Sequence, residues 1–237
     1  MTPWHLTIER NNIEALKLLI KRGRYRASPT PDILTPPRSP LAMAARRTSL
    51  DLMSLLISAG CGLRDLDTGG LTPLHHAAQA YSLESIRFLV ENGSDVSSLT
   101  EDGSSPLHYA VAARSSKKVG VVAYLISKGS DPFLARRDGL TSIDIVIEGG
   151  SGDLSLNVIG KVLQTLIDWK PPDRPVDVDL SQPLLRLCQL ELVSQSLWLS
   201  TALKILLDNG ADLLRTNEAG KTTFGVLLCA WQHNSSD

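Results

Sequence analysis

Apolar residues recur along the chain with the period of an α-helix, in short segments that come in pairs. In the clearest pair, residues 72–78 and residues 83–91 each place their apolar side chains on one helical face. Thr72 can cap the first helix, Pro73 fits its first position, and Gly93 follows the second helix, where a left-handed residue ends it. Because helices this short cannot bury their apolar faces alone, we expect other parts of the chain to cover them.

The same helix pair recurs along the whole chain. Units begin near residues 2, 39, 72, 105, 141, 182 and 222; two of the steps are 33 residues and the others are lengthened by loops. With the Thr-Pro-Leu-His motif at residues 72–75, this period resembles that of ankyrin repeats. The resemblance implies one all-α domain over residues 1–237, an ankyrin-repeat α-solenoid of stacked helix-turn-helix units with short hairpin loops. Units five to seven depart most from the pattern.

Three insertions interrupt the repeats, at residues 24–38, 149–153 and 169–179. The first is rich in Pro, Ser and Thr, and we expect an exposed loop there. The Ser-Pro and Thr-Pro pairs within residues 28–40 fit either proline-directed phosphorylation or a polyproline II ligand. The alternative is a tolerated loop insertion, in which Ser39 only caps the next helix.

Histidines hold the fourth position of the cap motif in three units. The resemblance implies that His5, His75 and His108 bond to backbone groups and to the cap hydroxyl, which ties neighbouring units together. A metal or catalytic role would need carboxylate or thiolate partners at ligand spacing, and the recurring position supplies none. The adjacent His76 is expected to be a surface histidine. Unit five has Asp144 where the histidine is expected.

Two glycine-containing segments resemble phosphate-binding loops only in part. Residues 149–153 follow a predicted helix rather than a strand and lack a following lysine. The segment Gly220-Lys-Thr222 has Arg215 where a nucleotide-binding loop has its first glycine, so it fits a hairpin turn before a helix cap instead. A nucleophile–base pair is not evident either. The sequence therefore predicts no enzyme activity, no cofactor and no metal.

The composition, with 43% hydrophobic and 21% charged residues, is that of a folded globular protein. The net charge of −1 argues against nucleic-acid binding, and no apolar run reaches the roughly 20 residues that span a bilayer. Three widely spaced cysteines argue against a disulfide framework, and no signal-peptide core follows Met1. We therefore expect a monomer with no membrane association, inside the cell in the cytoplasm or nucleus.

The resemblance implies a scaffold that binds a partner protein on the concave face formed by the hairpin tips and first helices. Residues 1–47 hold nine Lys and Arg against three Asp and Glu, and the rest of the chain carries a net charge of about −7. Arg46 and Arg47 beside Arg38 form a basic patch, so we expect a partner with an acidic segment near repeats one and two. An ordinary solvated surface is the alternative.

The candidate binding residues are repeat positions that the core does not need. They are Arg38, Arg46, Arg47, Leu66, Thr68, Leu71, Gln79, Leu99, Glu101, Asp102, Ser104, Arg136, Arg137 and Asp138. The alternative function is a regulatory or sensor segment of a larger multidomain protein, controlled by phosphorylation within residues 28–40.

Overall fold

The structure, a computed structural model, describes residues 3–22, 39–112, 115–149, 156–169, 179–189 and 197–216, together with residues 220, 222, 223 and 225. Within these residues the chain forms twelve α-helices and no strand. The predicted insertions lie outside the described residues, except for Gly149, Trp169 and Asp179. Arg38 and most of the Ser-Pro and Thr-Pro pairs lie outside them as well.

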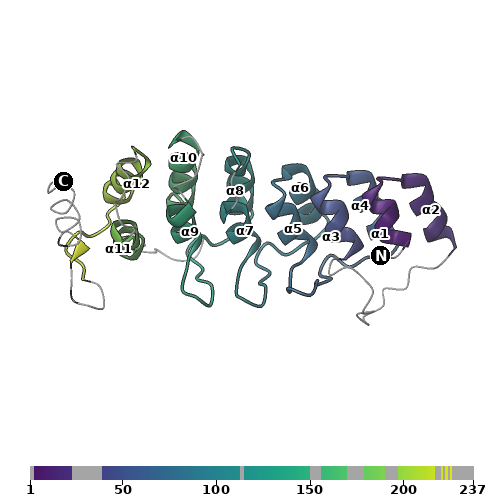
Figure 1. The fold of residues 1–237 in the computed structure, drawn as a ribbon, viewed down its shortest axis with the longest axis horizontal. Helices are drawn as coiled ribbons and strands as arrows, with labels where there is room; N and C mark the ends of the chain where they lie inside the picture. Colours follow the sequence, from purple (N-terminus) through teal and green to yellow (C-terminus); the bar gives the residue numbers. More distant parts are fainter. Residues whose placement is uncertain are drawn as a thin grey trace, which may run out of the picture.

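The helices form pairs that stack into an elongated solenoid (Figure 1). The pairs are α1 (Pro3–Glu9) with α2 (Ile13–Lys21), α3 (Pro40–Arg46) with α4 (Leu50–Ser58), α5 (Pro73–Gln79) with α6 (Leu83–Glu91), α7 (Pro106–Ala112) with α8 (Lys118–Ser127), α9 (Ser142–Gly149) with α10 (Leu156–Ile167), and α11 (Ser181–Gln189) with α12 (Leu197–Asp208). The first helices make one row and the second helices the other, and the loops between pairs project from the row of first helices. The predicted all-α solenoid is confirmed.

Cap residues start the first helices at the positions that the pattern indicates. The Ser39 hydroxyl accepts a hydrogen bond from the Ala42 N–H at 3.1 Å, and the Thr72 hydroxyl accepts one from the His75 N–H at 3.4 Å. A proline follows each of these two caps. Ser39 thus caps α3, which is the role that it has in the loop-insertion alternative. In unit six, α11 begins at Ser181, one residue before the predicted start.

Two series of glycines with positive φ mark the ends of units two, three, four and six. The second helices are followed by one series, Gly60, Gly93, Gly129 and Gly210, with φ of 92°, 97°, 93° and 89°. Ten residues later in each unit a hairpin turn holds the other, Gly70, Gly103, Gly139 and Gly220, with φ of 74°, 80°, 79° and 72°. Gly220 therefore lies in a turn, as predicted. The Thr222 hydroxyl accepts a hydrogen bond from the Gly225 N–H at 3.0 Å, as a cap does.

The core is a row of aliphatic side chains that runs along the stack. In the first helices, the residue two positions after the cap is fully buried: Leu41, Leu74, Leu107 and Ile143. In the second helices, the residue four positions before the closing glycine is fully buried: Leu56, Leu89, Leu125 and Leu206. Each helix packs mainly on its own pair and on the neighbouring pairs, so the core is continuous but extends in one dimension. None of the helices described combines the length and apolar character that crossing a bilayer requires.

Candidate protein-binding surface

Three loops between helix pairs form a row of hairpins, residues 62–71, 95–104 and 131–140, on the side of the first helices (Figure 1). Each hairpin is closed by the same two backbone hydrogen bonds. In the second hairpin, the Thr100 N–H donates to the Ser104 carbonyl at 3.0 Å, and the Gly103 N–H donates to the Thr100 carbonyl at 3.0 Å. The equivalent bonds in the other two hairpins measure between 2.9 and 3.1 Å. The three loops therefore share one defined conformation.

Neighbouring hairpins are in direct contact. A Cβ atom added to Gly70 would lie 3.1 Å from the backbone nitrogen of Glu101, and one added to Gly103 would lie 3.3 Å from that of Arg137. The Arg137 N–H also donates a hydrogen bond to the Asp102 carbonyl at 3.0 Å. The hairpins thus form one continuous platform rather than three separate loops.

Histidines tie this platform to the first helices. Nδ1 of His75 accepts a hydrogen bond from the Thr72 N–H at 3.1 Å, so Nε2 carries the proton and donates to the Ser104 carbonyl at 3.2 Å. His108 repeats this pattern, with 3.0 Å to the backbone nitrogen of its cap and 3.1 Å to the Leu134 carbonyl. Burial lowers the pKa of His75 to about 4 and also lowers the pKa of His108. The predicted link between units is confirmed for His75 and His108, and both rings are neutral at pH 7.

Two sequence-based expectations were wrong. His76, expected at the surface, is only 2% exposed, because its Nε2 lies 2.7 Å from Oδ2 of Asp67 in the first hairpin. The other oxygen of Asp67 accepts two backbone N–H bonds of the same hairpin at 2.9 Å each, so one carboxylate joins the loop to α5. Ser104, proposed as a binding residue, is also 2% exposed. It lies at the hairpin base, where its carbonyl receives the His75 hydrogen bond.

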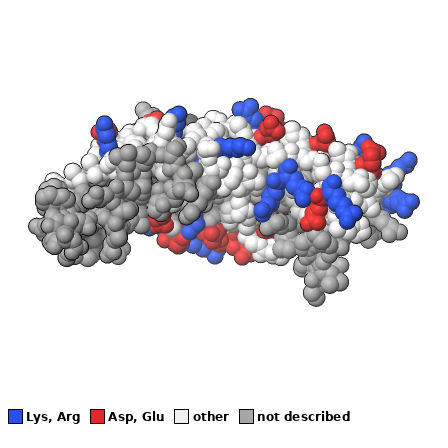
Figure 2. Space-filling model, turned by 45° about the horizontal axis from the view of Figure 1, so that its top comes forward, with Lys and Arg blue, Asp and Glu red and all other residues white. Residues whose placement is uncertain are grey.

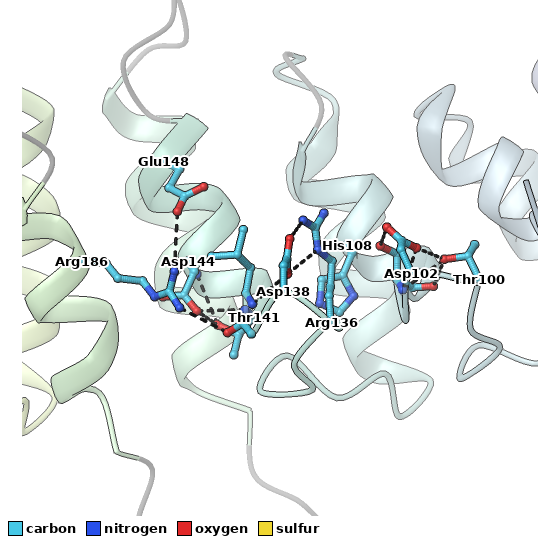
Figure 3. A network of polar contacts seen from close by, with 12 residues as sticks. Thr100, Asp102, His108, Arg136, Asp138, Thr141, Asp144, Glu148 and Arg186 are labelled. Atoms are coloured by element: carbon cyan, nitrogen blue, oxygen red, sulfur yellow. Dashed lines mark hydrogen bonds and ion pairs between the residues drawn. The ribbon is translucent and has the colours of Figure 1, made fainter. Parts of the chain in front are cut away.

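A polar network continues the platform across units four to six (Figure 3). Asp102 accepts hydrogen bonds from the hydroxyls of Thr100 and Ser104, and the Thr100 bond is the largest of the influences that lower the pKa of Asp102. Arg136 pairs with Asp138 and thereby lowers the pKa of Asp138 to about 2. Both carboxylates are therefore ionised at neutral pH.

The departure from the pattern at Asp144 changes how units five and six are joined. The Thr141 N–H and hydroxyl donate to Oδ2 of Asp144 at 2.9 and 2.7 Å, so the carboxylate completes the cap as histidine does elsewhere. It has no proton to donate to a neighbouring unit, and Arg186 of α11 makes the link instead. The Arg186 Nε lies 3.4 Å from Oδ1 of Asp144, and its Nη2 donates to the Gly139 carbonyl at 3.4 Å. Glu148 lies 3.8 Å from the same guanidinium.

Sequence reasoning did not single out Arg186. The signal that could have found it is Asp144 itself, which replaces a histidine that is buried in units three and four. A carboxylate at a buried position requires a cation or several hydrogen-bond donors nearby. An arginine in the following unit is a suitable source, because its planar group can bond a carboxylate and a carbonyl together.

The described candidate binding residues fall into two groups, at opposite ends of the first helices. Arg46, Arg47 and Gln79 are exposed at the carboxyl ends of α3 and α5. The others lie in the hairpins, before the first helices begin. A helix of this length spans about 10 Å, so the two groups border one strip of surface rather than one cluster. The hairpin candidates are Leu66, Thr68, Leu71, Leu99, Glu101, Asp102, Arg136, Arg137 and Asp138. All of them are exposed except Leu71 and Arg136, which are half-buried.

Other chemistry is limited in the part of the chain that the structure describes. No group of three His, Cys, Asp or Glu side chains within it is placed to hold a metal ion. Cys61 and Cys188 are buried, and burial raises the pKa of the Cys188 thiol to about 11. A thiol with so high a pKa is a poor nucleophile at neutral pH.

Comparisons with known proteins agree with this geometry. The sequence model for ankyrin repeats, in three copies, matches residues 41–136. Among solved structures, the ankyrin repeat domain of Bcl-3, described as a unique member of the IkappaB protein family, is similar with a TM-score of 0.71. The two chains are 22% identical, and the similarity covers 98% of each. None of the curated proteins compared shows significant sequence similarity. The fold recognised at residues 41–136 thus extends over nearly the whole chain.

Proposed function

This chain is an ankyrin-repeat protein, and we propose that it is a scaffold that binds a partner protein on the concave face formed by its hairpin tips and first helices. Ankyrin repeats are protein-interaction modules, which supports this class of function. The observation that carries the proposal is the hairpin platform. Its backbone is fixed by hydrogen bonds within and between loops, while its outward side chains are exposed.

A fixed backbone with exposed side chains favours binding for an energetic reason. Association costs conformational entropy when loops must be ordered, and a surface that is already ordered avoids most of this cost. His75 and His108 hold the platform against the first helices from within. The outward residues can therefore vary between proteins without disturbing the fold, which is the property that a recognition surface needs.

The charge distribution supports an acidic partner segment at the carboxyl end of α3. Arg46 and Arg47 are exposed there, and Arg10 is exposed in the corresponding turn of the first unit. Figure 2 shows Lys and Arg side chains gathered toward the end formed by the first units, while several Asp and Glu side chains lie along the lower edge in the middle. Complementary charge chiefly raises the association rate and selects the orientation of the partner.

An affinity capture from cell extract tests the proposal. Wild-type protein is compared with Arg46→Glu/Arg47→Glu and with a matched control, Lys161→Glu/Lys204→Glu, which makes the same charge change on exposed residues of α10 and α12. We expect a partner that the wild type and the control retain and that the Arg46/Arg47 variant loses. Equal retention by all three proteins would contradict the acidic-segment assignment, and the absence of any specifically retained protein would contradict the scaffold itself.

The proposal also includes a monomer located in the cytoplasm or nucleus. The continuous one-dimensional core leaves the hairpin platform free for a different protein, which supports a monomer. Light scattering on the purified protein measures the mass directly, with 25.7 kDa expected for one chain. Cell fractionation tests the location.

A further inference from the structure

Two leucines stand out on the hairpin platform. Leu66 of the first hairpin is 62% exposed and Leu99 of the second is 48% exposed. Both lie four residues before the turn glycine, so they hold the same position in consecutive units. Single exposed leucines are common on protein surfaces, but two at the same position of consecutive hairpins offer a partner two apolar contacts on one platform.

The contact between the two hairpins places these leucines on adjoining loops of the platform. The closeness of Gly70 to the backbone of Glu101 shows that the loops touch, and stacked units repeat at about the packing distance of helices, roughly 10 Å. The same position in the third hairpin is Ala135, which has almost no side chain to offer. The series of apolar contacts therefore ends at the second hairpin.

Acidic residues are concentrated in and just before the second hairpin. Residues 88–113 contain no Lys or Arg, and their four acidic residues are all exposed: Glu91, Asp95, Glu101 and Asp102. The hydrogen bond from Thr100 lowers the pKa of Asp102, so its charge persists at neutral pH. Within the three hairpins, the exposed arginines are Arg64, in the hairpin of Leu66, and Arg137, in the third hairpin.

We infer that Leu66 and Leu99 are the apolar anchor site for a partner segment in which a large apolar residue is flanked by Lys or Arg. The apolar side chain covers the two leucines, and the basic side chains face the acidic second hairpin. This inference rests on the proposed scaffold function and adds the chemistry of a second contact. The partner would then be bipolar, with an acidic part near Arg46 and Arg47 and a basic, apolar part on the hairpins.

Selection from a random-peptide library displayed on phage tests the inference, with the intact protein as bait. The variant Leu66→Ser/Leu99→Ser removes both apolar contacts, and Glu101→Lys reverses a charge of the second hairpin. Leu18→Ser is the matched control, because Leu18 of α2 is also 62% exposed but lies outside the hairpins. Peptides selected on the wild type are then synthesised, and their affinity for all four proteins is measured by fluorescence anisotropy.

We expect the selected peptides to share an apolar residue flanked by Lys or Arg. Their binding should weaken about tenfold or more in the double leucine variant, weaken with Glu101→Lys, and stay unchanged with Leu18→Ser. An acidic consensus, no consensus, or equal binding to the double leucine variant would overturn the inference. The scaffold proposal is tested separately, by protein capture and by the Arg46/Arg47 variant rather than by these peptides. Failure of one proposal can therefore be distinguished from failure of the other.

Discussion

The cap histidine carries two hydrogen bonds that only its neutral ring can make together. His75 accepts from the Thr72 N–H through Nδ1 and donates to the Ser104 carbonyl through Nε2. Protonation of Nδ1 would remove the first bond and place a charge in a fully buried site beside His76. The stability of the fold is therefore coupled to pH at this residue.

Acidification should destabilise the protein between pH 6.5 and about 4. The folded pKa of His75, about 4, lies below its ordinary value of 6.5, so the unfolded chain binds the proton more tightly. The contribution of His75 to the free energy of unfolding is fully present above pH 6.5. It falls as the pH drops to the folded pKa, by about 3 kcal/mol in total. Urea denaturation of the wild type at a series of pH values measures this loss.

His75→Gln separates this effect from the acid titration of other groups. Glutamine at this position can still complete the cap but cannot titrate. We expect it to cost about 1 kcal/mol at pH 7, through the lost bond to Ser104, and to show a smaller loss of stability toward pH 4 than the wild type. Parallel pH profiles for the two proteins would refute the assignment of the coupling to His75.

Single residues were predictable from the sequence where the interaction is local. The cap Thr72 bonds within its own turn, and the role of His75 follows from the resemblance to ankyrin repeats. His76 and Ser104 were assigned to the surface because their burial depends on contacts that the pattern does not encode. Asp67 reaches His76 across nine positions, and Ser104 meets a ring from another unit.

At the scale of elements, the turn glycines have two distinct roles. Gly70 and Gly93 both have positive φ, at 74° and 97°. A Cβ atom at Gly93 would meet nothing within 4 Å, whereas one at Gly70 would lie 3.1 Å from the next hairpin's backbone. One glycine therefore serves only the local backbone, and the other also allows two hairpins to touch.

Alanine at each glycine separates these roles. Gly93→Ala should cost about 1 kcal/mol, which is the penalty for a left-handed residue with a side chain. Gly70→Ala should cost at least about 1 kcal/mol more than Gly93→Ala, because the backbone of Glu101 must also shift. Urea denaturation measures the free energy of unfolding of both variants. Equal losses in the two variants would show that the hairpins tolerate separation.

The ion pair at Arg186 holds a junction that hydrogen bonds from histidine hold elsewhere. Arg186→Gln removes the cation from the buried Asp144, so we expect a loss of about 1 to 2 kcal/mol, discounted because Arg186 is itself 34% exposed. Amide hydrogen exchange should accelerate more in α11 and α12 than in α5 and α6. Lys17→Gln, which breaks the exposed pair with Glu14, is the control and should change stability by less than about 0.5 kcal/mol. Uniform acceleration in all helices would argue against a local junction.

Helices proved predictable because their ends carry local signals. The second helix of unit three was expected at residues 83–91, and α6 occupies Leu83–Glu91, between the cap Ser82 and the closing Gly93. In unit six, the pattern places the start one residue late, since α11 includes Ser181. The junction at Arg186 could not be predicted with the same ease, because it joins residues 42 positions apart, at Asp144 and Arg186, without a repeated motif.

For the whole molecule, the architecture was predicted from a resemblance. The period near 33, together with the Thr-Pro-Leu-His motif at residues 72–75, resembles that of ankyrin repeats, and this resemblance implied the all-α solenoid. The binding surface was only partly accessible from the sequence. Repeat positions showed which residues the core does not use, but contacts between hairpins decide which of these form one platform. The identity of the partner is encoded in neither the period nor the core.

A one-dimensional stack also predicts that damage far from the hairpin platform stays local. Leu206 of α12 and Leu89 of α6 are both fully buried, but α12 packs on α10 and α11, while α6 packs on α3, α4, α5 and α8. Alanine at either position should cost about 2 to 5 kcal/mol. Leu206→Ala should accelerate hydrogen exchange only in α10, α11 and α12 and leave peptide binding at the hairpins intact. Leu89→Ala should accelerate exchange from α3 to α8 and abolish that binding. If Leu206→Ala accelerates exchange throughout, the chain folds as one cooperative unit, and the hairpin platform depends on every repeat.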